Sequence, residues 1–518
     1  MSPSRPRSRT PLALFASLAS AALLLSGCSV PTADTARTAL VALPRSTPAQ
    51  LAPYYGQKLR WRSCGVPGFE CATMKAPLDY AKPAAGDVRL AVARKKATGP
   101  GTRLGSLLVN PGGPGGSAVG YLQQYAGLGY PAQVRARYDM VAVDPRGVAR
   151  SEPVTCLDGR AMDAYTQTDM TPDDPRETDA LVASYRKFAE GCGADAPRLL
   201  RHVSTVEAAR DMDVLRAALG DAKLTYVGAS YGTFLGATYA GLFPERVGRL
   251  VLDGAMDPSL PARRLNLDQT AGFETAFQSF AKDCVRHPDC PFTGTPAQVG
   301  AGLKAFFRRA DARPLPTGDA DGRTLGEALA TTGVIAAMYD ESSWERLREA
   351  LSAAIRENDG AGLLVLADSY YERDSAGHYA NLMSANAAVN CLDLPPAYAT
   401  PEEIRAALPA FEKASPVFGE GMGWASLNCA YWPVRATGTP HRITADGAAP
   451  ILVVGTLRDP ATPYRWAQSL AAQLSSGRLL TYDGDGHTAY GRGSVCVDSA
   501  INAYLLRGTV PSTGLRCS

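Results

Sequence analysis

The chain has 518 residues, of which 46% are hydrophobic and 20% charged, a composition typical of folded globular proteins. This balance excludes a disordered or fibrous chain. The formal net charge is only +3 and no basic run with interleaved aromatic residues occurs, so nucleic acid is not expected as a partner.

The first 27 residues have the features of an export signal. Three arginines, at positions 5, 7 and 9, precede an apolar stretch over residues 12–25 that is too short and too rich in alanine and serine for an ordinary membrane span. The sequence Leu25-Ser26-Gly27-Cys28 resembles a bacterial lipobox, in which the cysteine is acylated and becomes the mature N-terminus. We therefore expect residues 1–27 to be a lipoprotein signal peptide and Cys28 to be lipidated. The alternative is an ordinary signal peptide cleaved nearby.

Removal of this segment takes away three of the 53 basic residues and none of the 50 acidic ones, which leaves a formally neutral mature chain. Residues 28–57 are rich in proline, threonine, alanine and serine in irregular order, with no apolar period, which predicts a flexible tether. We expect the protein at the outer face of the bacterial cell membrane, held there by lipid alone, with release into the medium as a further route.

Residues 58–257 alternate short apolar runs with helical patterns. Continuous apolar runs are typical of parallel strands buried on both faces, and residues 205–219 have the apolar spacing of a crossover helix. The predicted strands cover residues 88–93, 106–110, 140–143, 224–227 and 247–252. Alternating strands and helices predict an α/β fold with a doubly wound, mostly parallel sheet.

A glycine-rich loop follows the second predicted strand. Asn110 to Ser117 reads Asn-Pro-Gly-Gly-Pro-Gly-Gly-Ser, and its glycines allow the backbone to approach a substrate carbonyl. A phosphate-binding loop is disfavoured because no Gly-Lys-Ser/Thr follows. We expect the N–H of Gly113 to be an oxyanion donor, with Gly112 as the next choice, and an unremarkable turn as the alternative.

The pentapeptide Gly228-Ala-Ser-Tyr-Gly232 lies between a predicted strand and a helical stretch of small residues, 233–242. This is the strand, sharp turn and helix of a nucleophile elbow, in which glycines make room around a strained serine. The pentapeptide alone is weak evidence in a glycine-rich chain. In this context it predicts Ser230 as a nucleophile and the N–H of Tyr231 as the second oxyanion donor.

From residue 258 to 449 the strand and helix alternation stops. The segment is mostly helical in pattern, and an insertion of this size between two sheet strands predicts a cap over the strand ends, where open α/β sheets bind ligands. The predicted helices cover residues 273–283, 325–339, 344–356 and 401–411. The alternative is a helical domain that has no contact with the chemistry.

Residues 450–518 return to the sheet pattern, with strands predicted over 451–454 and 478–482. A serine nucleophile needs a base, and the base must be oriented by an acid. His487 follows the second strand through a glycine-rich turn, so we expect it to be the base; the alternative is a solvent-exposed turn histidine.

The expected acid is Asp459, which follows the first of these two strands by a short turn. Thr462, three residues later, is placed to donate to its carboxylate. Asp253, after the strand that follows the elbow, is a rival for the same role.

Ten cysteines are left when Cys28 is set aside, and an even number in an exported chain suggests disulfides. Proximity in sequence suggests the pairs Cys64–Cys71, Cys156–Cys192, Cys284–Cys290, Cys391–Cys429 and Cys496–Cys517. Reduced buried thiols are the alternative. No paired C-x-x-C and no H-E-x-x-H motif occurs, so we expect neither a metal nor a cofactor.

Together these segments resemble the exported tripeptidyl aminopeptidase-like serine peptidases, relatives of the prolyl aminopeptidases within the α/β-hydrolases. The resemblance covers residues 61–517. It rests on the loop Asn110–Ser117, on Asp144-Pro-Arg-Gly147 with Ser151 and Cys156, on Gly228–Gly232, on Leu252-Asp-Gly254, and on Asp459-Pro-Ala-Thr-Pro463 with His487. It implies an α/β-hydrolase fold, a triad of Ser230, Asp459 and His487, a helical lid, and release of short peptides from a free N-terminus.

An aminopeptidase should also bind the substrate ammonium with a carboxylate of the cap. Glu274, Asp393 and Glu420 are candidates, each with a purely structural role as the alternative. Where simpler prolyl aminopeptidases have His-Gly-Gly-Pro-Gly, this chain has Pro111-Gly-Gly-Pro-Gly115, which leaves the length of the released peptide open. Two rival functions are a carboxylesterase or lipase on the same triad and a noncatalytic surface protein of the same fold.

Overall fold

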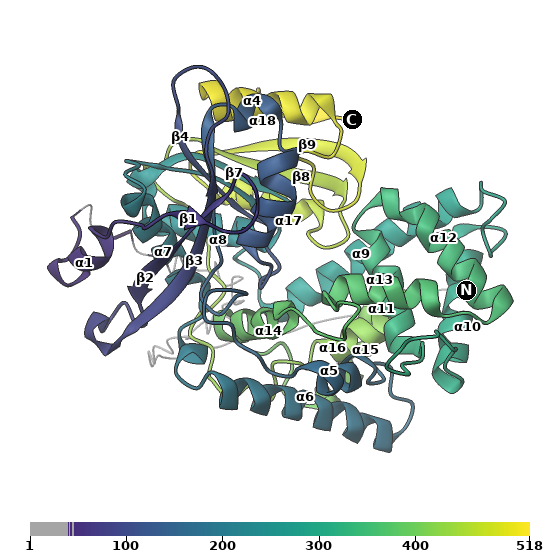
Figure 1. Ribbon diagram of the computed structural model, residues 1–518. Coiled ribbons are helices and arrows are strands. Elements are labelled where there is room, and N and C mark those ends of the chain that lie inside the picture. The colour runs from purple at the N-terminus through teal and green to yellow at the C-terminus, as the bar shows by residue number, and fades with distance from the viewer. Residues whose placement is uncertain (1–39, 41, 44–45) are drawn as a thin grey trace, which may run out of the picture. The chain divides into compact units, whose positions relative to one another are not determined.

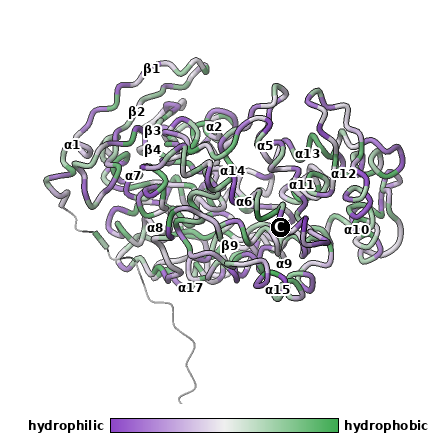
Figure 2. Tube along the Cα trace, turned by 90° about the horizontal axis from the view of Figure 1, so that it is seen from below, coloured by the Kyte–Doolittle hydropathy of each residue, from purple (hydrophilic) through white to green (hydrophobic). Residues whose placement is uncertain are grey.

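A computed structural model of the chain describes residues 40, 42–43 and 46–518. The predicted signal peptide, Cys28 and most of the predicted tether lie outside these described residues. No helix of the described part is long and apolar enough to cross a membrane. Figure 2 accordingly shows hydrophobic and hydrophilic stretches interleaved along the chain in both the strand-rich and the helix-rich regions.

The centre of the fold is one sheet of ten strands in the order β1-β2-β3-β5-β4-β6-β7-β8-β9-β10. From β5 through β10 all neighbouring strands are parallel, whereas β1, β2 and β3 pair antiparallel and join the sheet at β5. The strands are β1 (Arg62–Ser63), β2 (Glu70–Pro77), β3 (Asp87–Lys95), β4 (Gly105–Asn110), β5 (Tyr138–Val143), β6 (Leu224–Ala229), β7 (Val247–Asp253), β8 (Ile451–Arg458), β9 (Gly477–Asp485) and β10 (Arg516–Cys517). All seven strands expected from the sequence are present, and the predicted doubly wound, mostly parallel sheet is confirmed.

Helices cover both faces of this sheet, so the inner strands are buried on both sides. Neighbouring residues of one strand enter different cores: Leu108 packs with helices α7, α8 and α17, while Leu107 and Val109 pack with α2, α4 and α18. The helices of this sheet domain are α1 (Ala52–Tyr55), α2 (Ala118–Tyr121), α3 (Gly127–Gly129), α4 (Ala132–Arg135), α7 (Thr205–Ala218), α8 (Tyr231–Leu242), α17 (Tyr464–Gln473) and α18 (Val495–Arg507). Burial on both faces explains the continuous apolar runs in the sequence.

Between β7 and β8 the chain leaves the sheet and forms the helical cap. Its helices are α9 (Ala262–Cys284), α10 (Pro296–Ala312), α11 (Glu327–Met338), α12 (Trp344–Ser352), α13 (Ala361–Tyr371), α14 (Leu382–Asp393), α15 (Pro401–Ala414) and α16 (Gly419–Ala425). Helices α9 to α13 share a separate hydrophobic core built around Phe277, Phe280, Phe306 and Phe307. Figure 1 shows this helical region beside the sheet domain, with α14 on the side that faces the sheet.

Two segments cross the division that the sequence suggests. Helix α6 (Pro175–Asp195), which precedes the elbow in sequence, packs Leu181 and Tyr185 against cap residues such as Trp424, and it runs together with α5 (Gly159–Thr166) along the cap in Figure 1. In the other direction, Val389 and Leu392 of α14 belong to the core of the sheet domain. The cap is therefore joined to the sheet domain by exchanged helices as well as by its two chain connections.

All five disulfides suggested by sequence proximity are present: Cys64–Cys71, Cys156–Cys192, Cys284–Cys290, Cys391–Cys429 and Cys496–Cys517. The pair Cys391–Cys429 lies within the cap and connects the end of α14 to the segment that follows α16.

Candidate active site

Ser230 occupies a strained turn between β6 and α8. Its φ is 57° and its ψ −127°, outside the regions that a residue with a side chain ordinarily adopts, and such strain is typical of functional turns. Its N–H donates to the carbonyl oxygen of Asp253 at 2.9 Å, and the Thr233 hydroxyl donates to its carbonyl oxygen at 2.6 Å. The expected strand, turn and helix are thus present, and the side chain lines a cavity at the carboxyl end of the sheet.

The glycine-rich loop lies directly against this turn. A Cβ atom added to Gly112 would come within 2.8 Å of the Tyr231 nitrogen and 2.9 Å of Ser230 Cβ, so only glycine fits there. The Gly112 N–H donates to the Asn110 side chain at 2.8 Å. The N–H groups of Gly113 and Tyr231 have no acceptor among the described residues. This difference favours Gly113 over Gly112 as the second oxyanion donor.

The motif Asp144-Pro-Arg-Gly147 supports that loop without lining the cavity. Buried Asp144 accepts from the Ser117 hydroxyl and from the Val119 N–H, both at 2.9 Å, and so fixes the end of the loop. Arg146 is fully buried and makes a bidentate pair with Asp211 at 2.7 Å. The motif therefore has a structural part in this site.

His487 and Asp459 are brought together from two loops. Nδ1 of His487 lies 2.9 Å from both carboxylate oxygens of Asp459, so the hydrogen-bond network places the ring proton on Nδ1 and the lone pair on Nε2. Nε2 is buried and has no hydrogen-bond partner among the described residues. A buried ring nitrogen with a free lone pair is what a general base requires.

Asp459 is only 2% exposed, and backbone donors hold it. The N–H groups of Ala461 and Thr462 donate to Oδ1 at 2.9 and 2.8 Å, and the Thr462 hydroxyl donates to Oδ2 at 3.0 Å. With the Thr488 N–H, which donates to Oδ2 at 3.3 Å, four donors besides the histidine balance the buried charge and fix the direction of the carboxylate. The threonine contact expected from the sequence is present.

Asp253, the rival acid, does not contact the His487 ring by any hydrogen bond of the described residues. Its carboxylate accepts from the N–H groups of Ala489 and Tyr490, at distances of 2.8 to 3.0 Å. Because its carbonyl oxygen also accepts from Ser230, Asp253 ties the turn of the serine to the loop of the histidine. Burial raises the pKa of this carboxyl above its usual value.

The cap contributes directly to the histidine. The Tyr339 carbonyl, at the end of α11, accepts from the His487 N–H at 2.9 Å, and the two rings meet edge to face with centroids 5.4 Å apart. Sequence patterns did not single out Tyr339, because the contact joins segments almost 150 residues apart. The cap therefore contacts the histidine that the sequence predicts as the base, which favours the cap interpretation over a helical domain remote from the site.

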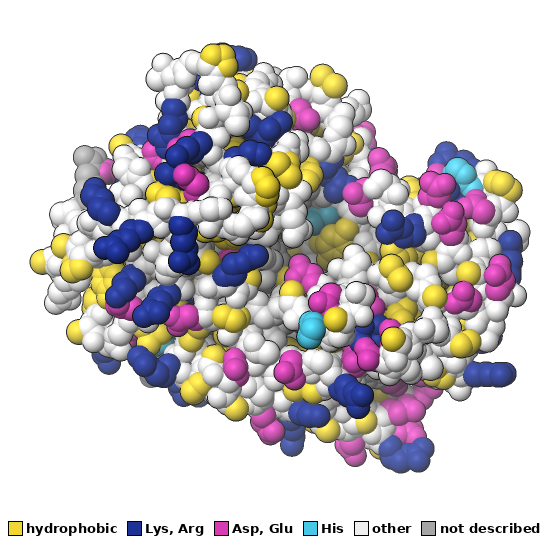
Figure 3. Space-filling view, viewed as in Figure 1, with side chains coloured by type: hydrophobic (Ala, Val, Ile, Leu, Met, Phe, Trp, Pro, Cys, Tyr) yellow, Lys and Arg dark blue, Asp and Glu magenta, His cyan; other side chains and the backbone are white. Residues whose placement is uncertain are grey.

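A cavity of about 410 Å³ opens above Ser230 between the sheet domain and the cap, and Figure 3 shows the surface hollowed there. Its walls carry several side-chain amides, which can both donate to and accept from a peptide backbone. These are Asn266 and Gln269 of α9, Asn386 and Asn390 of α14, and Asn428.

A second cavity, of about 470 Å³, lies inside the cap and continues the first. The two cavities share five lining residues: Ile335, Tyr370, Met422, Ala425 and Asn428. The cap cavity is lined by four acids, Asp173, Asp311, Glu327 and Glu420, and by two basic residues, Lys304 and Arg308. Burial and the neighbouring carboxylates raise the pKa of Glu327 to about 7.

The three acids proposed from the sequence as ammonium ligands lie in different places. Glu274 accepts from Ser415 and Gln278, away from both cavities. Asp393 lines the catalytic cavity but accepts two hydrogen bonds from Thr205. Of these three acids, only Glu420 lines the cap cavity. No pattern in the sequence points to Glu327, which lines the same cavity, because the segments from α5 to α6 and from α10 to α11 meet only in the folded cap.

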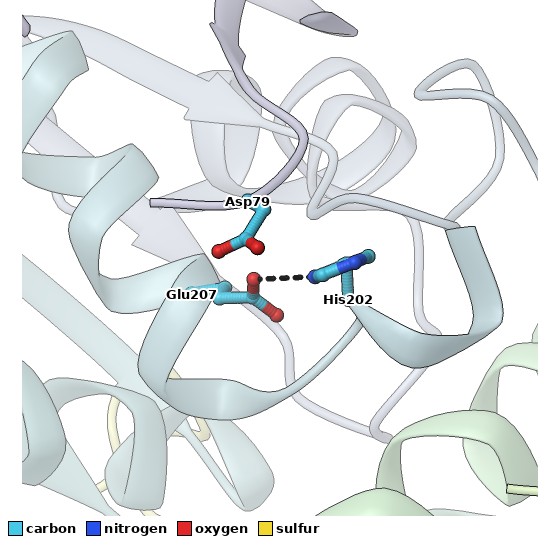
Figure 4. Close-up of side chains that lie close together, drawn as sticks. All are labelled: Asp79, His202 and Glu207. Atoms are coloured by element: carbon cyan, nitrogen blue, oxygen red, sulfur yellow. Dashed lines mark hydrogen bonds and ion pairs between the residues drawn. The ribbon is translucent and has the colours of Figure 1, made fainter. Parts of the chain in front are cut away.

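Two groups of acidic and histidine side chains among the described residues have ligand atoms within 4.8 Å of one another. Figure 4 shows the first, Asp79, His202 and Glu207, in which His202 Nδ1 lies 3.0 Å from Glu207. The Arg146 guanidinium is 3.6 Å from the same Glu207 carboxylate, which disfavours a second cation there. The other group is Asp169, Asp311 and Glu327, of which Asp311 and Glu327 line the cap cavity.

A sheet of this topology with a serine on its nucleophile turn, a later acid and a last histidine is that of an α/β-hydrolase. The family described as "TAP-like protein" matches residues 415–517. Serine protease Hip1 of Mycobacterium tuberculosis is 38% identical over 532 residues, covering 98% of this chain and 97% of that protein. Carboxylesterase B of the same species is 39% identical over 521 residues, 98% of each chain. Tripeptidyl aminopeptidase of Streptomyces lividans is 33% identical over 485 residues, 88% and 86% of the two chains.

Similarity to solved structures is weaker. Proline iminopeptidase of Mycobacterium smegmatis covers 84% of this chain and 93% of its own, at 15% identity and a TM-score of 0.32, a likeness too low to carry an argument about function. The family assignment rests on the relatives that align over nearly the whole chain. The chain belongs to the tripeptidyl aminopeptidase-like family and is a serine hydrolase of that peptidase family.

Proposed function

We propose that the protein is an exported serine exopeptidase that releases short peptides, first of all tripeptides, from substrates with a free N-terminus. Ser230 attacks the scissile carbonyl while His487 takes its proton and then passes it to the leaving amine. Asp459 holds the imidazole in its Nδ1–H form, and the N–H groups of Gly113 and Tyr231 bind the oxyanion. Water then releases the acyl peptide from Ser230, so the proposed steps need neither metal nor cofactor.

The observation that carries this proposal is the environment of His487. Its Nδ1 is bonded to a buried carboxylate, its Nε2 is buried and unpaired, and Asp253 connects its loop to the turn of Ser230. His441 also has a buried, unpaired Nε2, but its Nδ1 bonds a backbone carbonyl, whereas that of His487 bonds a carboxylate that can orient the ring as a base.

The cap cavity supports the preference for a free N-terminus. It continues the catalytic cavity through shared walls, and its Glu327 has no basic partner within 4 Å among the described residues. A substrate whose scissile carbonyl lies at Ser230 and whose first residues enter this cavity would bring an ammonium group toward these carboxylates. Carboxylates that raise each other's pKa are stabilised by a cation.

The decisive experiment uses one peptide offered with a free and with an acetylated N-terminus, with the products identified by mass spectrometry. The proposal expects cleavage of the free form alone, and the fragment mass reports the length released. The Ser230→Ala variant should lose turnover while keeping its circular dichroism spectrum and melting temperature. Wild-type turnover in that variant would refute the assignment of the nucleophile.

The relative named carboxylesterase B makes an esterase the second candidate. The triad does not discriminate, since an ester is easier to cleave than an amide. An esterase should hydrolyse short acyl esters at rates that are unaffected by Glu327→Gln. The peptidase proposed here should lose affinity for free peptides in that variant by about 10- to 100-fold, the value of one charge-assisted hydrogen bond. Glu349→Gln, an exposed acid on α12 outside both cavities, is the matched control.

We also propose that Cys28 is lipidated after removal of residues 1–27 and that the protein is anchored outside the cell. The support is the sequence of the export signal. Mass spectrometry of the mature N-terminus should find an acylated cysteine, and Cys28→Ser should move the protein from the membrane fraction to the soluble one. A Cys28→Ser variant that stays in the membrane fraction would contradict the proposed lipid anchor.

A further inference from the structure

Helix α14 belongs in sequence to the cap, but it contacts both halves of the proposed oxyanion hole. Near its start, Asn386 Nδ2 donates to the carbonyl oxygen of Pro114 at 3.1 Å. The glycine loop approaches the helix so closely that a Cβ atom on Gly115 would lie 2.5 Å from the Leu382 carbonyl oxygen. The loop that contains Gly113 therefore rests on this helix.

The last residue of the same helix, Asp393, reaches the other half of the hole. One carboxylate oxygen accepts from the Thr205 N–H at 2.9 Å, at the first residue of α7, and the other accepts from the Thr205 hydroxyl at 2.5 Å. That hydroxyl also lies 2.5 Å from the phenol oxygen of Tyr231. All three side chains are buried, with exposures of 8% for Asp393, 1% for Thr205 and 3% for Tyr231.

The direction of this chain of hydrogen bonds follows from counting protons. A threonine hydroxyl has one proton to donate, and a carboxylate has none. When Asp393 is ionised, Thr205 must donate to it, and the Tyr231 phenol in turn donates to Thr205. The phenol proton has no other acceptor among the described residues, so this arrangement is the one that satisfies every buried group.

The charged neighbour that affects the pKa of Asp393 is Glu207, on α7. Burial is the main cause that raises the pKa of Asp393 to about 7. The Glu207 carboxylate also raises this pKa, and the two Thr205 hydrogen bonds act in the opposite direction. Glu207 itself is paired with His202 and lies 3.6 Å from Arg146. The Asp393 carboxylate at the end of the network, which can only accept, therefore sets the direction of its hydrogen bonds; a positive charge beside it does not.

We propose that Asp393 is a positioning residue for catalysis: through Thr205 it fixes Tyr231, and with Asn386 on the same helix it makes the cap set the geometry of the oxyanion hole. The inference rests on the proposed roles of Tyr231 and Gly113 as oxyanion donors. Since these donors act on the transition state, loss of the network should lower kcat and leave KM almost unchanged. A helix that only anchored the cap would instead change the binding of substrate.

The test compares wild type with Asp393→Asn. The asparagine can accept from the Thr205 N–H, but its amide donates to the Thr205 hydroxyl. The Thr205 and Tyr231 hydroxyls then share one hydrogen bond between two protons, so one buried proton has no acceptor. We expect kcat on a peptide substrate to fall by at least tenfold, with KM within about threefold of wild type. A kcat within twofold of wild type in Asp393→Asn would overturn the proposal.

A second pair of variants keeps the test decisive should Asp393→Asn not fold. Thr205→Val has the shape of threonine without its hydroxyl and should lower kcat as Asp393→Asn does, whereas Thr205→Ser, which keeps the hydroxyl, should retain at least a third of it. Equal kcat in the two Thr205 variants would refute the network. Labelling of Ser230 by a fluorophosphonate separates the two hypotheses: wild type that is neither labelled nor active would reject the proposed function itself, while labelled, active wild type with unaffected variants would reject the role of Asp393 alone.

Discussion

Replacement of Asp459 by asparagine tests the assignment of the acid, because asparagine keeps the size of the side chain and changes only its hydrogen bonding. The carboxylate accepts from His487 Nδ1, from the Ala461, Thr462 and Thr488 N–H groups and from the Thr462 hydroxyl. The two shorter backbone hydrogen bonds, from Ala461 and Thr462, point at one oxygen, so the asparagine oxygen should take that place and its amide should face the histidine.

An amide facing Nδ1 donates to it, which moves the ring proton to Nε2. The imidazole then has no lone pair directed toward Ser230 and cannot take its proton. The same exchange in a serine triad costs about 10⁴ in kcat, and by the relation between rate and barrier this equals ~5.5 kcal/mol of transition-state stabilisation. We expect Asp459→Asn to lower kcat by this order while the melting temperature falls by only a few degrees.

The matched control is Asp253→Asn, the neighbouring buried acid. Its carboxylate is bonded to the backbone N–H groups of Ala489 and Tyr490, so its loss should lower stability and reduce kcat by less than 100-fold. Steady-state kinetics on one peptide, with melting curves for each variant, make the comparison. A kcat for Asp459→Asn within 100-fold of wild type, or a larger loss in Asp253→Asn, would refute the reasoning.

Three further predictions use other parts of the site. Gly112→Ala places a Cβ atom 2.4 Å from a carbonyl oxygen of the nucleophile turn and should reduce kcat at least 100-fold. The control is Gly318→Ala, where no atom lies within 4 Å of the added Cβ; it should change the free energy of unfolding by about 1 kcal/mol and leave kcat unchanged. Because the pKa of Glu327 is raised to about 7, its carboxylate is charged above that pH and neutral below it. The KM for free peptides should therefore rise as the pH falls from 8 to 6. A pH profile of KM that is the same in wild type and in Glu327→Gln would contradict this prediction. Asp393 has a pKa of about 7 in the fold against 3.8 unfolded, so the folded state binds the proton more tightly. The free energy of unfolding should therefore fall as the pH rises from 5 to 8, by up to about 3 kcal/mol. Denaturant titrations of Asp393→Asn should lack this part of the slope, and equal slopes would exclude it.

The strands were predictable where they are buried on both faces, since such strands are continuous apolar runs. Strand β2 was missed because it pairs antiparallel and is buried on one face only: Ala72, Met74 and Ala76 are buried, while Thr73 and Lys75 between them are exposed. The alternation was present in the sequence as a weak signal, in small residues. Helix α6 also had a signal, the capping box of Asp174 and Glu177 followed by a long helical pattern.

The nucleophile turn, the glycine loop and the five disulfides could be predicted from the sequence. Each of them depends on residues that are close in sequence: glycines that permit positive φ, a small-residue helix after a strand, and cysteine pairs separated by 6 to 38 residues. The order of Ser230, Asp459 and His487 along the chain added a topological argument, because parallel strands bring their carboxyl ends to one edge of the sheet.

The tertiary structure decided which of these residues meet. His487 pairs with Asp459, whereas Asp253 accepts from backbone N–H groups of the loop that follows the histidine. The Tyr339 carbonyl of the cap accepts from the His487 N–H, and Asp393 accepts from Thr205. Local turn chemistry is fixed by sequence neighbours, and so the sequence determines it. Contacts between segments a hundred or more residues apart depend on how whole helices pack, and packing is a property of shape that no short pattern carries.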